Sequence, residues 1–181
     1  ACIENGDDVT LITQLLDKDD AEQERRNGFE IFRVYFPRRY FFGAKGKRKN
    51  IRRVLYLFKK HLEIVKEKKI ETIYVSHFGM NGLFPLLIRP FYKFNFVILL
   101  HRGEIRNNAK KHPLFRLVLK AALLFCDSVI CVSEGMKKDI LKFSPYVKKK
   151  LQVILNGVPV SKINKSPVYV GPKPYILFVG R

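Results

Sequence analysis

Short apolar runs alternate with stretches of helical period along most of the chain. We expect the following runs to form strands: Val9–Thr13, Phe29–Tyr35, Thr72–Ser76, Phe96–Leu100, Ser128–Val132 and Gln152–Leu155. Helices are expected to fill most of the gaps between them. This alternation is typical of a mostly parallel sheet with helices on both faces, so the pattern predicts an α/β fold.

Three helices have clear signals. The longest is predicted over Asn50–Lys68, where one apolar stripe comprises Ile51, Val54, Leu55, Phe58, Leu62 and Val65 and the opposite face is almost entirely Lys and Arg. A second helix is predicted over Pro113–Phe125, with proline at a favoured first position. A third is predicted over Glu134–Phe143, with Ser133 as its N-cap.

Both ends of the sequence interrupt this pattern. In "LQVILNGVPV" an apolar run stops at Asn156-Gly157, a dipeptide that favours positive φ and a sharp turn, and no matching strand follows directly. A polar, proline-containing segment then leads to a second apolar run, "YILFVGR". The start, "ENGDDVTLIT", is typical of a helix end, a glycine turn and a strand. We therefore expect a chain clipped at both ends.

The composition indicates one ordinary domain. The chain has 181 residues, of which 47% are hydrophobic. Lys120 and Asp127 interrupt the longest apolar stretch, and the acidic N-terminus lacks the features of a signal peptide. The three cysteines show neither zinc nor disulfide spacing. A cytoplasmic protein is the expectation.

The distribution of charge is more informative than the net charge of +19. Nine of the 16 acidic residues fall within the first 30 positions, whereas residues 36–69 contain 13 Lys and Arg against two Glu. Such a block indicates an anionic partner, and nucleic acid, a membrane surface and phosphorylated substrates are all compatible with it.

The segment "FPRRYFFGAKGKRK" adds aromatic residues to this block. Rings beside cations suit the headgroup region of an anionic membrane. The residues that we expect at that surface are Arg38, Arg39, Tyr40, Phe41, Phe42, Lys47, Arg48, Lys49, Arg52 and Arg53. The alternatives are a solvated helix face whose loop aromatics pack on the domain, and RNA bound by base stacking. Because no RNA-binding motif accompanies the segment, we expect no nucleic acid and a peripheral position at the inner face of the membrane.

Six segments, in order, resemble the N-terminal domain of the family 4 glycosyltransferases, which are retaining enzymes of the two-Rossmann-domain (GT-B) architecture. "NGDDVTLIT" is similar to the second strand of the family, "IETIYVSHFG" to the fourth and "FVILLHRGE" to the fifth. "CDSVICVSEGMKKDI", "VILNGVPV" and "YILFVGR" resemble its Ala-Asp-x-Val-Ile-x-Val-Ser, Asn-Gly-Val and Gly-Arg segments. Asp7 takes the place of a family histidine, and the glycine-rich loop after the first strand is not in this sequence.

The resemblance implies a division of the chain. Residues 1–157 would form a Rossmann-like, acceptor-side domain without its first strand, and residues 158–173 an interdomain linker. Residues 174–181 would be the first strand of a donor-binding domain. Asn156 and Gly157 would be the hinge. Because the glycine-rich loop lies at the interdomain cleft in the family, we expect this fragment to be inactive alone.

Polar residues follow three of the predicted strands. In an open α/β sheet ligands bind beyond the carboxyl ends of the strands, so His77, His101 and Ser133 should project toward one crevice. The resemblance implies that His101 is catalytic and lies against the transferred sugar, where a neutral imidazole can bind hydroxyls or polarise the reacting centre. The alternative is a histidine whose hydrogen bonds are satisfied by loop backbone.

Neighbouring residues complete the candidate cleft. His77 either lines the acceptor pocket with Phe78 and Gly79 or caps a buried turn. Gly103 is expected to shape its loop, while Glu104 and Arg106 either grip acceptor hydroxyls or phosphate or pair with each other. The remaining cleft-lining candidates are Ser133 and Glu134. At this position Ser133 caps its helix, whose N-terminal N–H groups could also bind an anionic or hydroxylated ligand.

The donor side is represented by one residue. Arg181 resembles the family arginine that neutralises the departing nucleotide diphosphate, for which a guanidinium fork is well suited. No Asp-x-Asp cluster is present, so we expect no metal and no cofactor other than a nucleotide-sugar co-substrate.

The sequence thus predicts a retaining glycosyltransferase that acts on a glycan or lipid-linked acceptor in cell-surface polysaccharide synthesis. A basic nucleic-acid-binding module on a Rossmann-like sheet and a nucleotide-sugar epimerase of the same architecture are the alternatives.

Overall fold

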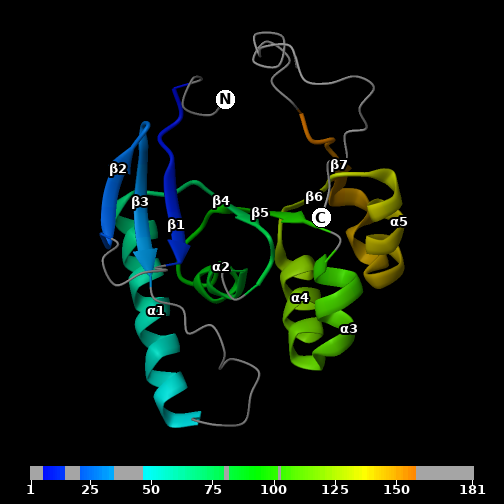
Figure 1. Cartoon of the computed structure of the whole chain (residues 1–181), viewed down its shortest axis with the longest axis horizontal. Coiled ribbons are helices and arrows are strands. Elements are labelled where there is room, and N and C mark those ends of the chain that lie inside the picture. Colours follow the sequence, from blue (N-terminus) through cyan, green and yellow to red (C-terminus); the bar gives the residue numbers. More distant parts are fainter. Residues whose placement is uncertain (1–5, 15–20, 35–46, 80–81, 102, 158–181) are drawn as a thin grey trace, which may run out of the picture.

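The computed structural model describes residues 6–14, 21–34, 47–79, 82–101 and 103–157. The first half contains β1 (Thr10–Gln14), β2 (Gln23–Arg26), β3 (Phe29–Val34), α1 (Lys47–Glu67), β4 (Thr72–Ser76), α2 (Leu83–Ile88) and β5 (Asn95–Leu100). The second half contains a π-helical segment η3 (Glu104–Asn108), α3 (Ala109–Lys111), α4 (Pro113–Phe125), β6 (Ser128–Cys131), α5 (Glu134–Phe143), a 3₁₀ segment η4 (Pro145–Lys150) and β7 (Leu151–Val153) (Figure 1).

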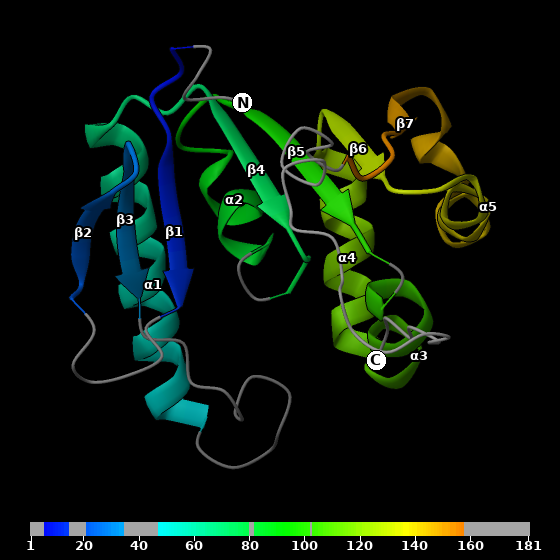
Figure 2. The ribbon, with the colours of Figure 1, turned by 45° about the horizontal axis from the view of Figure 1, so that its top comes forward.

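The described strands form two sheets. The larger has four parallel strands in the order β4-β5-β6-β7. The smaller has the order β1-β3-β2, in which β1 pairs with β3 in parallel and β2 pairs with β3 antiparallel. The smaller sheet lies beside the β4 edge of the larger one, with β1 nearest to β4 (Figure 2). The expected α/β fold, with a mostly parallel sheet flanked by helices, is confirmed.

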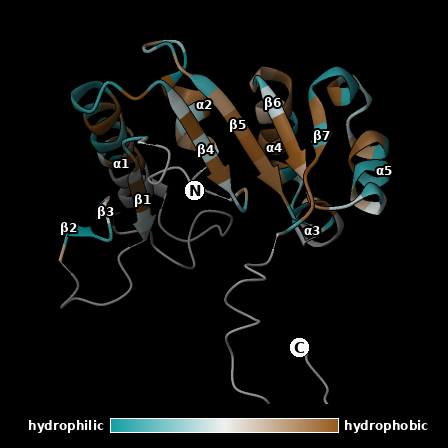
Figure 3. Cartoon of the chain, turned by 90° about the horizontal axis from the view of Figure 1, so that it is seen from above, coloured by the Kyte–Doolittle hydropathy of each residue, from teal (hydrophilic) through white to brown (hydrophobic). Residues whose placement is uncertain are grey.

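Burial alternates along the strands of the larger sheet. In β5, Phe96, Ile98 and Leu100 are fully buried, whereas Val97 and Leu99 between them are only half-buried. The buried residues face α2 and α4, which lie against the same face of the sheet (Figure 3).

Most predicted elements are confirmed within one or two residues. The strand over 72–76 and the helices over 113–125 and 134–143 have the predicted bounds. Strand β2 was missed, although "RRNGFE" carries a hairpin signal: Asn27 and Gly28 both have positive φ, 53° and 82°, and join β2 to β3. Neither Asn156 nor Gly157 has a positive φ, so the left-handed backbone conformation expected there is not adopted.

Helix α1 keeps most of its predicted stripe, because Val54, Phe58 and Leu62 pack against the core, but the buried face is wider and partly different. Leu55, expected in the core, is 59% exposed, whereas Leu57, Ile64 and Val65 are buried. The core face also includes His61, which lies one turn after Leu57; its ring stacks on Phe84 at 4.4 Å between centroids. Because His61 is polar, the apolar pattern did not predict that it lies on the buried face. Leu55 and Tyr56 are exposed, so the exposed face of α1 is not purely cationic.

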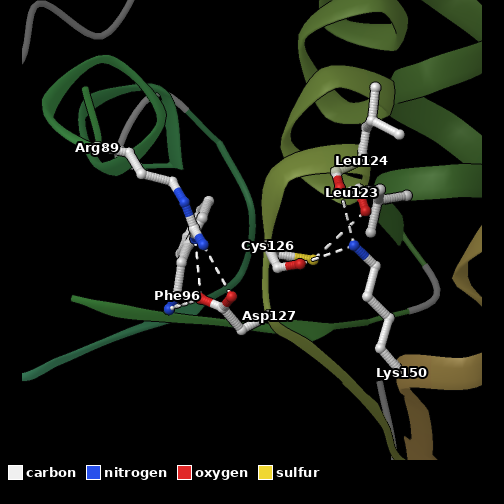
Figure 4. Close-up of polar contacts among 7 residues, drawn as sticks. All are labelled: Arg89, Phe96, Leu123, Leu124, Cys126, Asp127 and Lys150. Carbon is white, nitrogen blue, oxygen red and sulfur yellow. Dashed lines mark hydrogen bonds and ion pairs between the residues drawn. The ribbon is translucent and has the colours of Figure 1, made fainter. Parts of the chain in front are cut away.

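Charged side chains fix the amino-terminal edge of the larger sheet (Figure 4). Arg89, after α2, donates two hydrogen bonds of 2.8 and 2.7 Å to Asp127, whose carboxylate also accepts the Phe96 backbone N–H at 2.7 Å. Lys150 donates to the carbonyls of Leu124 and Cys126 at the end of α4. These bonds tie α2, β5, α4 and η4 together just before β5 and β6 begin.

Candidate active site

The carboxyl edge of the larger sheet brings two predicted histidines together. His77 directly follows β4 and His101 directly follows β5, and these strands pair in parallel with Ser76 opposite Leu99. The two imidazoles stack with 3.8 Å between centroids and 15° between planes. This contact brings together two of the three residues expected at this edge, His77 and His101.

His77 adopts a backbone conformation that few side chains tolerate. Its φ of 58° lies in the left-handed region, which costs a non-glycine residue on the order of 1 kcal/mol. Its Nδ1 lies 3.3 Å from the Ser76 hydroxyl, and the side chain is exposed. Unfavourable φ values of this kind often occur at active sites, where surrounding packing maintains them.

His101 combines a fixed backbone with a free ring nitrogen. Its backbone N–H donates to Glu104 Oε2 at 2.7 Å. Its Nε2 is shielded from solvent and has no hydrogen-bond partner among the described residues. Because a neutral imidazole carries one donor and one acceptor, this atom retains an unused hydrogen-bonding capacity. The alternative in which loop backbone satisfies the ring does not fit Nε2.

Glu104 does not fit the role of gripping an acceptor. The residue is only 4% exposed, and Oε2 is occupied by the His101 N–H. Burial raises the pKa of the Glu104 carboxyl above its usual value, while the hydrogen bonds from backbone N–H groups and the nearby imidazoles oppose that rise. The predicted alternative, a pair with Arg106, involves a side chain outside those described.

Phe78 and Gly103 also differ from their predicted roles. Phe78 is 2% exposed and packs edge-to-face on Phe115 at 6.0 Å, so it anchors the loop after His77 from inside the core. Gly79, next to it, is half-buried, and its carbonyl accepts the N–H of Gly82. Gly103 has a φ of −66° and open space around its missing Cβ, so its loop does not require glycine.

A third element ends at the same edge. Ser133, which follows β6, accepts the Met136 N–H at 3.2 Å, so the predicted N-cap is confirmed. Glu134 is exposed, and its carboxylate lies 3.5 Å from Lys137. Helix α5 packs against the π-helical segment that begins at Glu104. Helix α5 therefore lies close to the segment that follows His101.

Two features were not predicted from the sequence. They are the π-helical segment Glu104–Asn108 and the cluster of Arg89, Asp127 and Lys150 at the amino-terminal edge of the larger sheet. No sequence signal marks the former, although π-helical segments often occur at functional sites. Asp127 could have been found, since it precedes the predicted strand of β6. Arg181 and the linker lie outside the described residues, as do Arg38, Arg39, Tyr40, Phe41 and Phe42. Lys47, Arg48, Lys49 and Arg53 lie in α1, but their side chains are not described.

Three further features concern metal binding, membrane spans and cysteines. No group of three or more His, Cys, Asp or Glu in the described part of the chain could hold a metal ion. None of the described helices is long and apolar enough to cross a membrane. Cys126 and Cys131 are buried, as expected for thiols within apolar runs.

Comparison with known proteins identifies the fold and the family. A sucrose-phosphate synthase from Thermosynechococcus elongatus shares the fold with a TM-score of 0.59 and 17% identity, over 89% of this chain and 82% of that one. No curated protein sequence is significantly similar to the chain. The model of Glycosyltransferase Family 4 matches residues 1–162. The chain therefore belongs to Glycosyltransferase Family 4, a family of glycosyltransferases.

Proposed function

We propose that the chain forms the acceptor-side half of the cleft of a retaining glycosyltransferase. This enzyme would transfer a sugar from a nucleotide-sugar to a glycan or lipid-linked acceptor in cell-surface polysaccharide synthesis. The observation that carries the proposal is the stacked His77–His101 pair at the carboxyl edge of the sheet, where open α/β sheets bind ligands. Family membership supports sugar transfer as the chemistry.

His101 has the central role in this proposal. Its Nε2 hydrogen-bonds a sugar hydroxyl or polarises the reacting centre, because that atom has no other partner among the described residues. His77 supports the ring from its other face and contributes a polar edge to the acceptor side. The N-terminus of α5, capped by Ser133, lies next along the same edge.

In this proposal the donor is bound mainly by a second, donor-binding domain, as the resemblance to the family implies. Of the residues proposed to contact the diphosphate, this chain contains only Arg181. We therefore expect the 181-residue chain alone to bind nucleotide-sugars weakly. Calorimetry that measured donor binding in the micromolar range, or about −8 kcal/mol, would contradict the assignment of this chain to the acceptor side.

The experiment that tests the function uses the full-length enzyme. Nuclear magnetic resonance of the product should show that the anomeric configuration of the donor is retained. His101→Ala should abolish most product formation, while the matched variant His112→Ala, at an exposed histidine before α4, should leave it intact. Inversion at the anomeric carbon would refute the retaining mechanism. Interconversion of free nucleotide-sugars without transfer would instead identify an epimerase.

We further propose that the enzyme is peripheral at the inner face of the membrane. On α1, Leu55 and Tyr56 are 59% and 61% exposed, next to the exposed cations Arg52 and Lys59. Phe91, which follows α2 and is 65% exposed, lies against Phe58 of α1. Apolar side chains enter the headgroup boundary, and each nearby cation adds on the order of 1 kcal/mol on an anionic surface.

Vesicle co-sedimentation over a salt series tests this location. Neutralising Arg38, Arg39, Lys47, Arg48, Lys49, Arg52 and Arg53 should weaken binding to anionic vesicles, and added salt should have the same effect. Leu55→Ser with Tyr56→Ser should leave a weaker association that depends wholly on salt. Equal sedimentation of the wild type and the charge variant would mean that the basic block is only a solvated face. Tight salt-dependent binding to RNA without vesicle binding would favour the nucleic-acid alternative.

A further inference from the structure

Glu104 is a buried acidic residue that contacts the proposed catalytic histidine, His101. Its side chain is 4% exposed, and among the described residues it makes no ion pair with Lys or Arg. Taking a carboxylate out of water without a cation costs several kcal/mol unless hydrogen bonds compensate. A buried acid at this position therefore needs an explanation that an ordinary helix start does not provide.

Two hydrogen bonds join Glu104 to His101. Oε2 accepts the His101 N–H at 2.7 Å, and the Glu104 N–H donates back to the His101 carbonyl at 3.3 Å. The Glu104 side chain reaches back to a backbone N–H three residues earlier, as the Glu of a capping box does, but the Glu104 N–H is bound by a backbone carbonyl and not by a capping side chain. The pair closes the turn that joins β5 to the π-helical segment.

Another helix at the same edge starts without a buried charge. Helix α5 begins with the short neutral side chain of Ser133, which accepts the Met136 N–H at 3.2 Å. A capping function alone thus requires no buried carboxylate here. What distinguishes Glu104 is the residue that it holds, since His101 must keep its ring on His77 and its Nε2 free of other partners.

We propose that Glu104 is a positioning residue, which acts on glycosyl transfer through His101. Its carboxylate fixes the His101 backbone, so that the imidazole is held between that anchor and the ring of His77. Without the carboxylate, the His101 N–H turns toward another acceptor and the ring leaves the stack. The inference rests on the proposed function, because it assumes that His101 contacts the reacting sugar.

Steady-state kinetics of the full-length enzyme test the role. Glu104→Ala should lower kcat by about 10- to 100-fold, because small misplacements of a catalytic group have effects of this size. The KM for the nucleotide-sugar should stay nearly constant, since the donor binds mainly to the other domain. Glu104→Gln keeps an oxygen that can accept the His101 N–H, so it should recover most of the lost kcat. Glu71→Ala, at an exposed acid before β4, is the matched control and should have no effect.

A double-mutant cycle separates positioning from general stability. If Glu104 acts through His101, then Glu104→Ala should cause no further loss of kcat in the His101→Ala background. The inference is overturned if Glu104→Ala leaves kcat unchanged, if Gln recovers nothing, or if kcat falls by the same factor in both backgrounds. Those results would leave the proposed function intact, provided that His101→Ala alone is inactive. An active His101→Ala enzyme would instead refute the proposed function.

Discussion

Both edges of the four-stranded sheet carry ionisable side chains. Asp127 at the amino edge is paired with an opposite charge, whereas Glu104 at the carboxyl edge forms no ion pair with Lys or Arg among the described residues. At the amino edge, Asp127 has its charge matched by Arg89 and accepts a backbone N–H as well. At the carboxyl edge, Glu104 is buried without a described cation, His77 has a positive φ, and Nε2 of His101 has no described partner. This difference agrees with the proposed division of roles, in which the Arg89–Asp127 pair maintains the fold and the carboxyl edge is the proposed site of the chemistry.

The largest effect on stability should come from the amino edge. Asp127→Ala removes three hydrogen bonds of 2.7 to 2.8 Å and leaves the Phe96 N–H without its acceptor. We expect a loss of about 2 to 3 kcal/mol in the free energy of unfolding, measured by urea denaturation. At temperatures where the variant is folded, kcat should be unchanged. A fall in kcat without a fall in stability would break the comparison between the edges.

A smaller effect should come from the packing that supports the loop of His77. A Cβ added at Gly82 would lie 2.2 Å from the ring of Phe78, so Gly82→Ala must displace that ring. We expect a destabilisation of about 1 to 3 kcal/mol. Gly135→Ala, on α5 with open space around it, is the matched control. It should be neutral or stabilising, because alanine is the better helix former.

The sequence revealed the sheet more readily than the site. Strands and helices near Thr72, Pro113 and Glu134 follow from apolar periodicity and capping residues, which are local signals. His77 and His101 could be assigned to one edge because each follows a predicted parallel strand. Their ring stacking could not be predicted, since it depends on backbone geometry at residues that are 24 positions apart.

The errors have physical causes as well. Helix α1 buries His61 on its core face. This was not predicted, because a search for apolar periodicity does not count histidine as apolar. Phe78 was expected to line the acceptor pocket beside His77, whereas tertiary packing puts its ring against Phe115. Glu104 was expected to grip an acceptor or to pair with Arg106, and no local pattern in the sequence marks its burial or its hydrogen bond from His101.

His61 provides the contrast of a histidine within the core. Burial lowers its pKa from the ordinary value of 6.5, so below that pH the unfolded chain binds more protons than the folded protein. Stability should therefore be at its full value above 6.5 and fall by at most about 1.4 kcal/mol per pH unit below it. Urea denaturation at about pH 7.5 and about pH 5.5 measures this slope. His61→Phe, which keeps a ring against Phe84, should make the slope shallower; an unchanged slope would show that other groups cause it.

The central claim is that chemistry occurs at the carboxyl edge, through His101. The most direct measurement is kcat of full-length His101→Ala, with its melting temperature recorded in parallel. We predict that kcat falls by about 10² to 10⁴, as expected when a group that acts in the transition state is removed. The melting temperature should remain close to that of the wild type, because the ring makes no described hydrogen bond through Nε2. A variant with the kcat of the wild type would contradict the account.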